Sequence, residues 1–370
     1  MVEKPASKAP VLMVSSASPH TARVVRGLCN AGQPVVLATH GALPLEAHPA
    51  LLESVVVDLS VRHWRAASQL RELMLRWQPA VVHAQQANSV GWHAARAVQG
   101  SGVPLVLTLW GSDALLLPQR SLLHRWMVRR ALNAAQAWTA DAQVVLEAAR
   151  QVAGPASAGL LKEWIPLGVD DAFFASTTGA DIPRERRILS CRLHKPLYRI
   201  DAVIRAFAQL PAACSEWTLE VAASGPQTAE LKALARQLNV SQRVEFSGFL
   251  SPDELRRSYQ RAAVFVSVPR SDGSSVSLLE AMAAGCVPVV SDLPANREWV
   301  TDRVNGLLVP DVARLDATLA EAVARSASPL WGAGPGADNR ALIRRTASFT
   351  RNIAQFQELY ERSRAITHAR

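Results

Sequence analysis

Two carboxylates and a turn of small residues stand together in the stretch "SDGSSVSLLEAMAAGCVPVVSD", residues 271–292. Asp272 and Glu280 are eight positions apart, and a helix is expected to begin near Val276. The small residues of the turn are Gly273, Ser274 and Ser275. Small residues let a backbone approach a ligand closely, and the free N–H groups at a helix N-terminus bind phosphates or hydroxyls. The stretch therefore has the residue types of a site for a phosphorylated or sugar ligand.

Glu280 is the unusual residue of this run because its neighbours are apolar. At helical spacing it shares a face with Ser277, whereas the leucines and the methionine of the run can face a core. A carboxylate that accepts two hydrogen bonds suits the vicinal hydroxyls of a ribose. Taken alone, however, the pattern favours the simpler alternative of a core helix with one exposed glutamate.

Short apolar runs alternate with amphipathic segments along both halves of the chain. In the first half, "PVLMVSS", "PVVLATH", "AVVHAQ" and "PLVLTLW" have the apolar character of buried parallel strands, and helical patterns separate them. The segment "EWIPLGVDDAFF", residues 163–174, carries a proline and a glycine and is expected to end the first domain. The alternation restarts at "RRILSC". We therefore expect an α/β protein of two doubly wound domains, with ligands bound beyond the carboxyl ends of the strands.

The composition narrows the class of protein. The chain has 370 residues, which suits two domains, and a formal net charge of +9. This charge favours acidic partners such as nucleotides, nucleic acid or an anionic membrane surface, and an arginine-favouring genome is the alternative explanation. The four cysteines are scattered, so free thiols in a reducing compartment are expected rather than disulfides.

No metal is expected, because the sequence contains no Asp-x-Asp pair and no His or Cys cluster with ligand spacing. The N-terminal residues lack the long apolar segment of a secretory leader, and no run approaches eighteen apolar residues. We therefore expect a cytoplasmic protein without a transmembrane helix. Peripheral association with the inner face of the plasma membrane is a further candidate.

The stretch from Leu278 to Val290 resembles the Glu-x7-Glu region of retaining glycosyltransferases of family GT4, with one extra residue before Pro288. Other segments continue the resemblance: "SPHTARVV" (18–25), "TLWGSD" (108–113), "IPLGVD" (165–170), "RVEFSGFL" (243–250) and "LPANREWVTDRVNGLLV" (293–309). It covers nearly the whole chain, and the motifs are specific in combination.

The resemblance implies a GT-B fold, in which two Rossmann-like doubly wound domains face each other across a cleft. Residues 1–170 would bind the acceptor, residues 171–345 the nucleotide sugar, and residues 346–370 would form a helix that crosses back to the first domain. The implied activity is hexosyl or N-acetylhexosaminyl transfer from a nucleotide sugar, UDP-linked in our interpretation, with retention at the anomeric carbon. Closure of the cleft would exclude water.

The resemblance also implies roles on the donor side. Glu280 would hold the ribose, and Asp272 would face the donor sugar beside the backbone N–H groups of residues 273–276. Asp272 stands where relatives have glutamate, one methylene longer. Arg192 matches the arginine that grips the diphosphate, but the family's lysine is absent, so Lys195 or Arg199 would supply the second charge. Two further donor-binding candidates in strand-end loops are Gly225 and Phe249.

On the acceptor side, Trp110 stands where many relatives have histidine near the reacting sugar. A tryptophan cannot act as a base, but it can stack on a sugar face. Asp113 is the candidate for orienting or deprotonating the acceptor, and an N-cap is its alternative role. His20 and Ser112 complete this side. The candidate catalytic residues are thus Asp113, Asp272 and Arg192.

The segment from Pro118 to Trp138 is basic and amphipathic, which suits a membrane surface that carries a lipid-diphosphate acceptor, or an ordinary domain helix. The family analogy favours a glycan or lipid-linked acceptor in bacterial surface polysaccharide synthesis, such as lipopolysaccharide, O-antigen or exopolysaccharide. Three alternatives remain open: a GT-B nucleotide-sugar epimerase, a catalytically weakened subunit, and a basic nucleic-acid-binding protein. No nucleic acid is expected as a partner, because the positive charge is spread through both halves and no RNA or DNA module motif is present.

Overall fold

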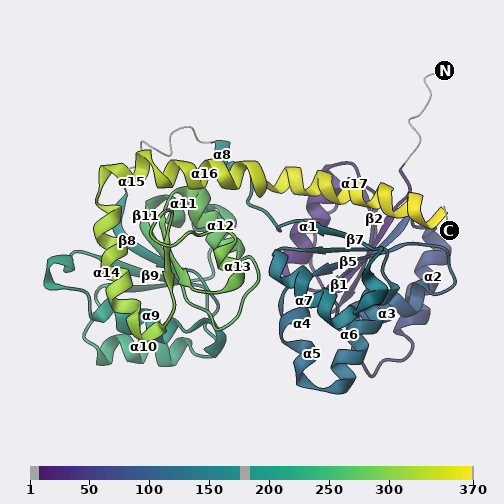
Figure 1. Ribbon diagram of the computed structural model, residues 1–370, viewed down its shortest axis with the longest axis horizontal. Helices are drawn as coiled ribbons and strands as arrows, with labels where there is room; N and C mark the ends of the chain where they lie inside the picture. The colour runs from purple at the N-terminus through teal and green to yellow at the C-terminus, as the bar shows by residue number, and fades with distance from the viewer. Residues whose placement is uncertain (1–7, 176–183, 369–370) are drawn as a thin grey trace. The chain divides into compact units, whose positions relative to one another are not determined.

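The structure, a computed structural model, describes residues 8–175 and 184–368 of the chain. They form two compact units (Figure 1). Unit 1 comprises Met1–Leu167 and Phe349–Arg370, and unit 2 comprises Gly168–Ser348. Each unit is a parallel sheet with helices on both faces, which confirms the expected α/β architecture with two doubly wound domains.

Within the described residues, unit 1 contains a seven-stranded sheet in the order β3-β2-β1-β4-β5-β6-β7. Every neighbouring pair is parallel. The strands are β1 (Val11–Ser16), β2 (Val35–His40), β3 (Leu51–Val56), β4 (Val81–Gln85), β5 (Leu105–Leu109), β6 (Ala137–Ala140) and β7 (Leu161–Trp164). The central strands are buried on both faces, whereas edge strand β3 alternates between half-buried and exposed residues, as an edge position dictates.

The helices of unit 1 cover the two faces of this sheet. They are α1 (Pro19–Asn30), α2 (Ala66–Trp77), α3 (Ser89–Val98), α4 (Ser112–Leu115), α5 (Leu117–Arg120), α6 (Leu122–Ala134), α7 (Gln143–Ala153) and α17 (Phe349–His368). Helices α1 and α17 pack together on one face, where they share a hydrophobic cluster with β1, β2 and β4. Helices α2, α3, α6 and α7 pack side by side in chain order (Figure 1).

Within the described residues, unit 2 contains a six-stranded parallel sheet in the order β10-β9-β8-β11-β12-β13. The strands are β8 (Glu185–Ser190), β9 (Thr218–Ala222), β10 (Val244–Gly248), β11 (Ala262–Ser267), β12 (Val287–Ser291) and β13 (Leu307–Val309). The strand order reverses direction between β8 and β11. In doubly wound sheets this switch point is where ligands bind, beyond the carboxyl ends of the strands.

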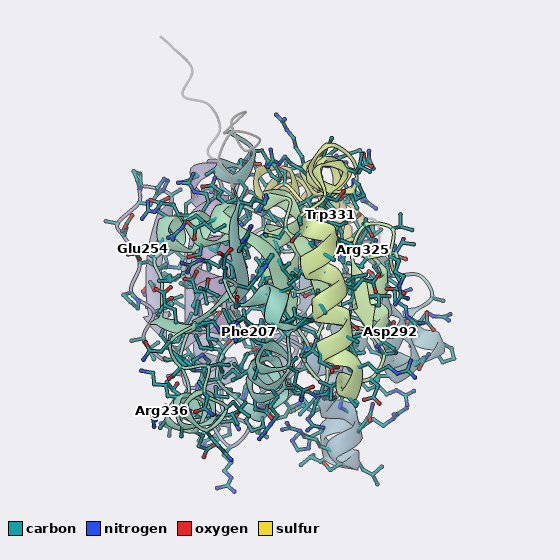
Figure 2. All side chains as sticks on the ribbon, turned by 90° about the vertical axis from the view of Figure 1, so that its left-hand side faces the viewer. Phe207, Arg236, Glu254, Asp292, Arg325 and Trp331 are labelled. Carbon is teal, nitrogen blue, oxygen red and sulfur yellow. The ribbon has the colours of Figure 1, made fainter. Side chains whose placement is uncertain are left out.

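The helices of unit 2 are α8 (Ala172–Ala175), α9 (Ile200–Ala208), α10 (Thr228–Gln237), α11 (Pro252–Arg261), α12 (Val276–Ala284), α13 (Pro294–Arg297), α14 (Leu315–Ser326), α15 (Pro329–Ala333) and α16 (Pro335–Thr346). Helix α11 begins with a capping box, in which Ser251 and Glu254 satisfy each other's backbone N–H groups. Exposed Arg236 and Glu254 lie toward the edge of the unit in Figure 2, and Phe207 lies nearer its middle.

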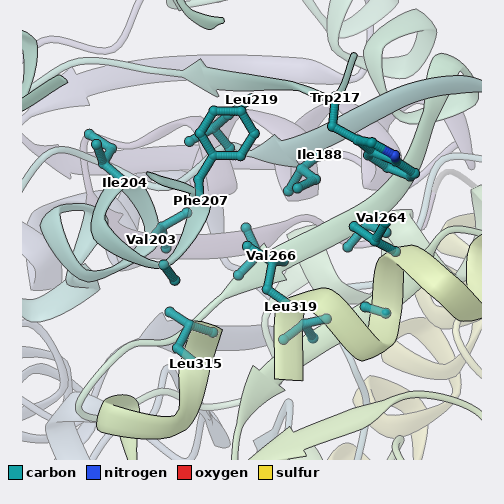
Figure 3. Close-up of a cluster of buried hydrophobic side chains, with 14 of the residues drawn as sticks. Ile188, Val203, Ile204, Phe207, Trp217, Leu219, Val264, Val266, Leu315 and Leu319 are labelled. Atoms are coloured by element: carbon teal, nitrogen blue, oxygen red, sulfur yellow. The ribbon is translucent and has the colours of Figure 1, made fainter. Parts of the chain in front are cut away.

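One hydrophobic core fixes the sheet of unit 2 against α9, α10 and α14. Phe207 from α9 and Leu319 from α14 pack with Val264 and Val266 of β11, and all four side chains are buried (Figure 3). Because apolar burial contributes about 25 cal/mol per Å² of surface removed from water, this cluster is a main source of stability in the unit. It holds β8 and β11 in place, so that the loops after them have a rigid base.

Candidate functional site

Helix α12 begins at Val276, as the sequence predicts, and follows β11 at the switch point of unit 2. Its C-terminus is closed by Gly285, whose φ of 80° lies in the left-handed region that glycine adopts freely. Arg184 and Arg340 both donate hydrogen bonds to the carbonyl of Ala284 at this end. These two cations interact favourably with the negative C-terminal end of the helix dipole. The positive N-terminal end lies beside the loop that precedes the helix.

Arg192 is the centre of a polar cluster at the N-terminus of α12. Its Nη2 lies 2.7 Å from Oδ2 of Asp272. Its Nη1 donates to Oγ of Ser275 and, at 3.1 Å, to Oγ of Ser277. Its guanidinium lies over the ring of Tyr198, 4.4 Å from the centroid. The loop after β8 thus supplies a cation that is held in one orientation at the N-terminus of α12.

The electrostatics of this cluster are those of a desolvated ion pair. Burial raises the pKa of Asp272 and outweighs the opposing effect of the Arg192 charge. Burial disfavours the charged form of Arg192, but the Asp272 carboxylate, Tyr198 and Cys191 together outweigh this effect, so the pKa of Arg192 rises. Both side chains remain partly exposed, at 12% for Arg192 and 20% for Asp272, so a ligand can reach them.

Glu280 lies one turn further along α12 and is half-buried. The hydroxyl of Tyr259, on α11, forms a side-chain hydrogen bond with Glu280. That hydroxyl also lies 3.0 Å from Sγ of Cys191. Burial raises the pKa of Tyr259, and the Cys191 and Glu280 side chains raise it further, so the tyrosine is a neutral donor. The carboxylate in the apolar run is therefore held by a buried tyrosine rather than being a solvated surface group.

The serines of the turn are held by neighbouring side chains. Ser274 accepts a hydrogen bond of 2.8 Å from Nε1 of the buried Trp299. The hydroxyls of Ser275 and Ser277 lie 2.7 Å apart and share the Arg192 guanidinium. Because these hydroxyls already have partners, the groups that the turn offers a ligand are chiefly the N–H groups of the first turn of α12, beginning at Val276.

Of the remaining donor-side candidates, Lys195 and Arg199 share the loop after β8 with Arg192, whereas Gly225 and Phe249 follow β9 and β10. Lys195 is exposed, and Arg199 precedes α9 with a left-handed backbone and a buried Nε that has no hydrogen-bond partner in the part of the chain described. Gly225 packs against the backbone of His194: a Cβ at this position would lie 2.6 Å from the His194 carbonyl oxygen. Its N–H donates to Thr228 Oγ1, so Gly225 has a packing role here.

Phe249 follows β10 and is 71% exposed. An aromatic ring with that exposure at the carboxyl edge of the sheet is available for stacking on a planar ligand group.

The acceptor-side candidates lie in unit 1, beyond β1 and β5. The rings of His20 and Trp110 meet edge to face, with centroids 5.7 Å apart. Ser112 is exposed in the first turn of α4. Asp113 is 3% exposed, and its carboxylate accepts from the backbone N–H of Ala87 at 2.7 Å and of Trp110 at 3.0 Å. The carboxylate is not the N-cap of α4: Gly111 occupies that position, without a side-chain hydrogen bond.

Burial raises the pKa of Asp113, against hydrogen bonds from Ala87 and Trp110 that favour the carboxylate. In this arrangement Asp113 ties the loop after β4 to the loop after β5 and so places Trp110. Asp113 and Trp110 thus form one assembly with His20, whereas Arg192, Asp272, Glu280 and residues 273–276 form the other.

Two general expectations concern metals and membranes. Among the described residues, no three His, Cys, Asp or Glu side chains gather in a way that suits a metal ion. No helix within residues 8–175 or 184–368 combines the length and the apolar character needed to span a bilayer.

Comparison with known proteins connects both units to one family. A family model described as "Glycosyl transferases group 1" matches residues 182–327, and one described as "Glycosyl transferase 4-like" matches residues 11–142. The alpha-monoglucosyldiacylglycerol synthase of Streptococcus pneumoniae is 23% identical over 267 residues, which are 66% of this chain and 59% of that protein. The matched region is therefore under two thirds of the length of that relative.

Solved structures share the fold. The sucrose-phosphate synthase from Thermosynechococcus elongatus superposes with a TM-score of 0.77 at 19% identity, covering 97% of this chain and 100% of that chain. Anabaena HepE in complex with UDP superposes with a TM-score of 0.76 at 16% identity, covering 95% and 99%. Since a glycosyltransferase family model matches in each unit and the fold is that of GT-B enzymes, the protein belongs to the GT4-type glycosyltransferases of GT-B fold.

Proposed function

We propose that this protein is a retaining glycosyltransferase that moves a hexosyl or N-acetylhexosaminyl group from a UDP-linked sugar to a glycan or lipid-linked acceptor in bacterial surface polysaccharide synthesis. The observation that carries the proposal is the cluster at the N-terminus of α12. There an arginine fixed by Asp272, Ser275 and Ser277 adjoins the first N–H groups of α12, those of Val276 and Ser277, with Glu280 one turn away on the same helix.

Each part of this cluster suits one part of a nucleotide sugar. Arg192 and the N–H groups of the first turn of α12 bind the diphosphate, because both are donors directed at the same point. Glu280 accepts hydrogen bonds from the ribose hydroxyls, and the Tyr259 hydroxyl keeps the carboxylate in place. Phe249 stacks on the base, and the high exposure of its ring after β10 supports this role.

The diphosphate is the leaving group of the transfer. As the glycosidic bond to phosphate breaks, negative charge grows on the diphosphate, and Arg192 with the positive end of α12 stabilises that charge without a metal. The departing phosphate oxygen then accepts the proton of the acceptor hydroxyl. Asp272 faces the donor sugar and orients Arg192.

On the acceptor side, Trp110 provides a stacking surface and His20 lies at its edge. The Asp113 carboxylate already accepts two backbone hydrogen bonds, so its role is to place Trp110 rather than to remove the acceptor proton.

The named relatives support the donor and acceptor classes. HepE was solved in complex with UDP, which favours a UDP-linked donor here. The pneumococcal relative is named for a glucosylated diacylglycerol, which favours a lipid-linked acceptor and a location at the inner face of the plasma membrane. The assignment to synthesis of lipopolysaccharide or a related polymer rests on the family resemblance alone.

The test is a binding screen of the purified chain against UDP, GDP, dTDP and their sugars by calorimetry, followed by transfer assays with the donor that binds. We expect UDP and one UDP-sugar to bind, and the labelled sugar to pass to a lipid-diphosphate or glycan acceptor. Release of a free epimerised nucleotide sugar without an acceptor would instead indicate an epimerase. Failure of every nucleotide to bind would contradict the assignment.

A further inference from the structure

Helix α6 in unit 1 exposes large apolar side chains on its outer face. Leu122 is 85% exposed, Leu123 is 62% exposed and Trp126 is 50% exposed. The inner face of the same helix is buried through Met127 and Val128. The helix therefore satisfies the core of unit 1 with one face and still presents three large apolar groups on the other.

Positive charge surrounds these apolar groups. Arg125, Arg129 and Arg130 are exposed on α6 beside them. Between residues 73 and 140 the only acidic residue is Asp113, and that carboxylate is buried. Neither α6 nor the neighbouring α3 contains an aspartate or glutamate to neutralise the arginines. The residues that α3 and α6 contribute to this face are thus apolar or cationic, with no acidic residue among them.

A cavity of about 670 Å³ opens between α3 and α6 on this side of the unit. Two tryptophan–arginine pairs line it. The guanidinium of Arg96 lies 4.9 Å from the ring centroid of Trp92, and that of Arg130 lies 6.0 Å from the ring centroid of Trp126. Each pair joins an aromatic face to a cation, an arrangement suited to an anionic group carried on an apolar body.

We propose that the outer face of α6, together with this cavity, is a docking surface for a bilayer that contains anionic phospholipid. Leu122 and Leu123 enter the acyl region, Trp126 lies at the interface, and the arginines bind lipid phosphates. The cavity between Trp92 and Trp126 accepts a phospholipid headgroup. The arginines of α3 and α6, which no acidic residue of these two helices neutralises, favour this occupant over a protein partner, whose interface would be charge-mixed or largely apolar.

The docking surface would bring the acceptor site of unit 1 to lipid-linked acceptors. This purpose, but not docking itself, rests on the proposed function. Docking itself involves neither donor nor acceptor. Vesicle binding can therefore fail while nucleotide binding and transfer to a soluble acceptor persist, which would count against the docking surface alone. Vesicle binding that persists while nucleotide binding and transfer fail would count against the proposed function alone.

The experiment is co-sedimentation of the full chain with phosphatidylcholine vesicles that contain or lack phosphatidylglycerol, at low and high salt. We expect binding to the anionic vesicles only, weaker at high salt. The double variants Leu122→Ser/Leu123→Ser and Arg125→Glu/Arg130→Glu should each lower the partition coefficient by about tenfold or more. All four positions are exposed, so the fold should persist, which circular dichroism checks.

Matched controls exist on unit 2. Leu330→Ser/Val304→Ser removes two apolar groups that are 79% and 61% exposed, and Arg205→Glu/Arg236→Glu makes the same change in charge. Both controls should bind vesicles as the parent does. The proposal is overturned if the parent chain ignores anionic vesicles, or if α6 variants and controls bind equally. It is also overturned if light scattering shows that the leucine pair mediates self-association without vesicle binding.

Discussion

Nη2 of Arg192 lies 2.7 Å from Oδ2 of Asp272, at the N-terminus of α12. In the proposed diphosphate site this ion pair is unexpected, because the carboxylate competes with the ligand for the cation. The pair makes sense if Asp272 fixes the guanidinium in the direction that the transferred sugar requires. Asp272 then contributes more to the rate of transfer than to nucleotide affinity.

The substitution Asp272→Asn tests whether Asp272 acts on the rate of transfer more than on nucleotide affinity. It removes a negative charge beside the diphosphate site, so UDP affinity should be unchanged or a few-fold tighter, while turnover should fall by at least about tenfold. Calorimetry with UDP and a transfer assay measure the two quantities. A variant that loses UDP affinity and keeps its turnover would assign Asp272 to ground-state binding instead.

Tyr259→Phe isolates the support of Glu280. The ring stays in its buried place, but the hydroxyl that bonds Glu280 and lies beside Cys191 is lost. Because Glu280 would then sample other rotamers, UDP affinity should fall about three- to tenfold. Cys191→Ser serves as control and should have little effect. Unchanged affinity in Tyr259→Phe would show that Glu280 needs no such support.

Gly225→Ala tests the packing role of the loop after β9. The added Cβ would meet backbone atoms of His194, which cannot yield as a side-chain end can. Denaturant unfolding should show a loss of about 1–3 kcal/mol for unit 2. Gly159→Ala, where an added Cβ would meet nothing within 4 Å, is the matched control and should be close to neutral. A Gly225→Ala variant as stable as the parent would mean that the loops after β8 and β9 can move apart readily.

The stability of unit 1 should depend on pH through His83. This side chain is fully buried between the hydroxyls of Tyr360 and Thr108, and burial lowers its pKa to about 3. The unfolded chain binds a proton near pH 6.5, so the unfolded state is favoured progressively as pH falls from 6.5 toward 3. The stabilisation is complete above pH 6.5, and its loss amounts to at most about 5 kcal/mol.

His83→Gln should flatten this dependence in acid-unfolding curves followed by circular dichroism, although its stability at neutral pH is lower. His124→Gln, on the surface helix α6, should retain the slope of the parent. An unaltered slope in His83→Gln would show that other groups govern acid unfolding.

Local sequence pattern predicted the elements that carry the donor cluster. The apolar run "RRILSC" identifies strand β8, and the helical pattern that begins near Val276 identifies α12. Position after a strand marked the loops that contain Arg192 and Asp272 as candidates, since carboxyl ends of parallel strands share one edge, but the role of Arg192 came from the family resemblance.

Local sequence pattern could not predict the side-chain contacts between elements that are distant in the chain. Tyr259 reaches Glu280 only because α11 and α12 pack on the same face, and nothing in the α11 sequence marks that tyrosine as part of a site. Trp299 holds Ser274 across 25 positions for the same reason. The pattern that suggested an N-cap for Asp113 did not reveal that its carboxylate bonds Ala87, 26 positions away.

Titration of UDP into Glu280→Ala tests most directly whether Glu280 and the N-terminus of α12 hold a nucleotide sugar. The matched control is Glu230→Ala, which removes an exposed carboxylate from the first turn of α10. We expect Glu280→Ala to weaken UDP binding by at least about tenfold, while its fold and the UDP affinity of Glu230→Ala stay as in the parent. Equal affinity for UDP in Glu280→Ala and the parent chain would contradict it.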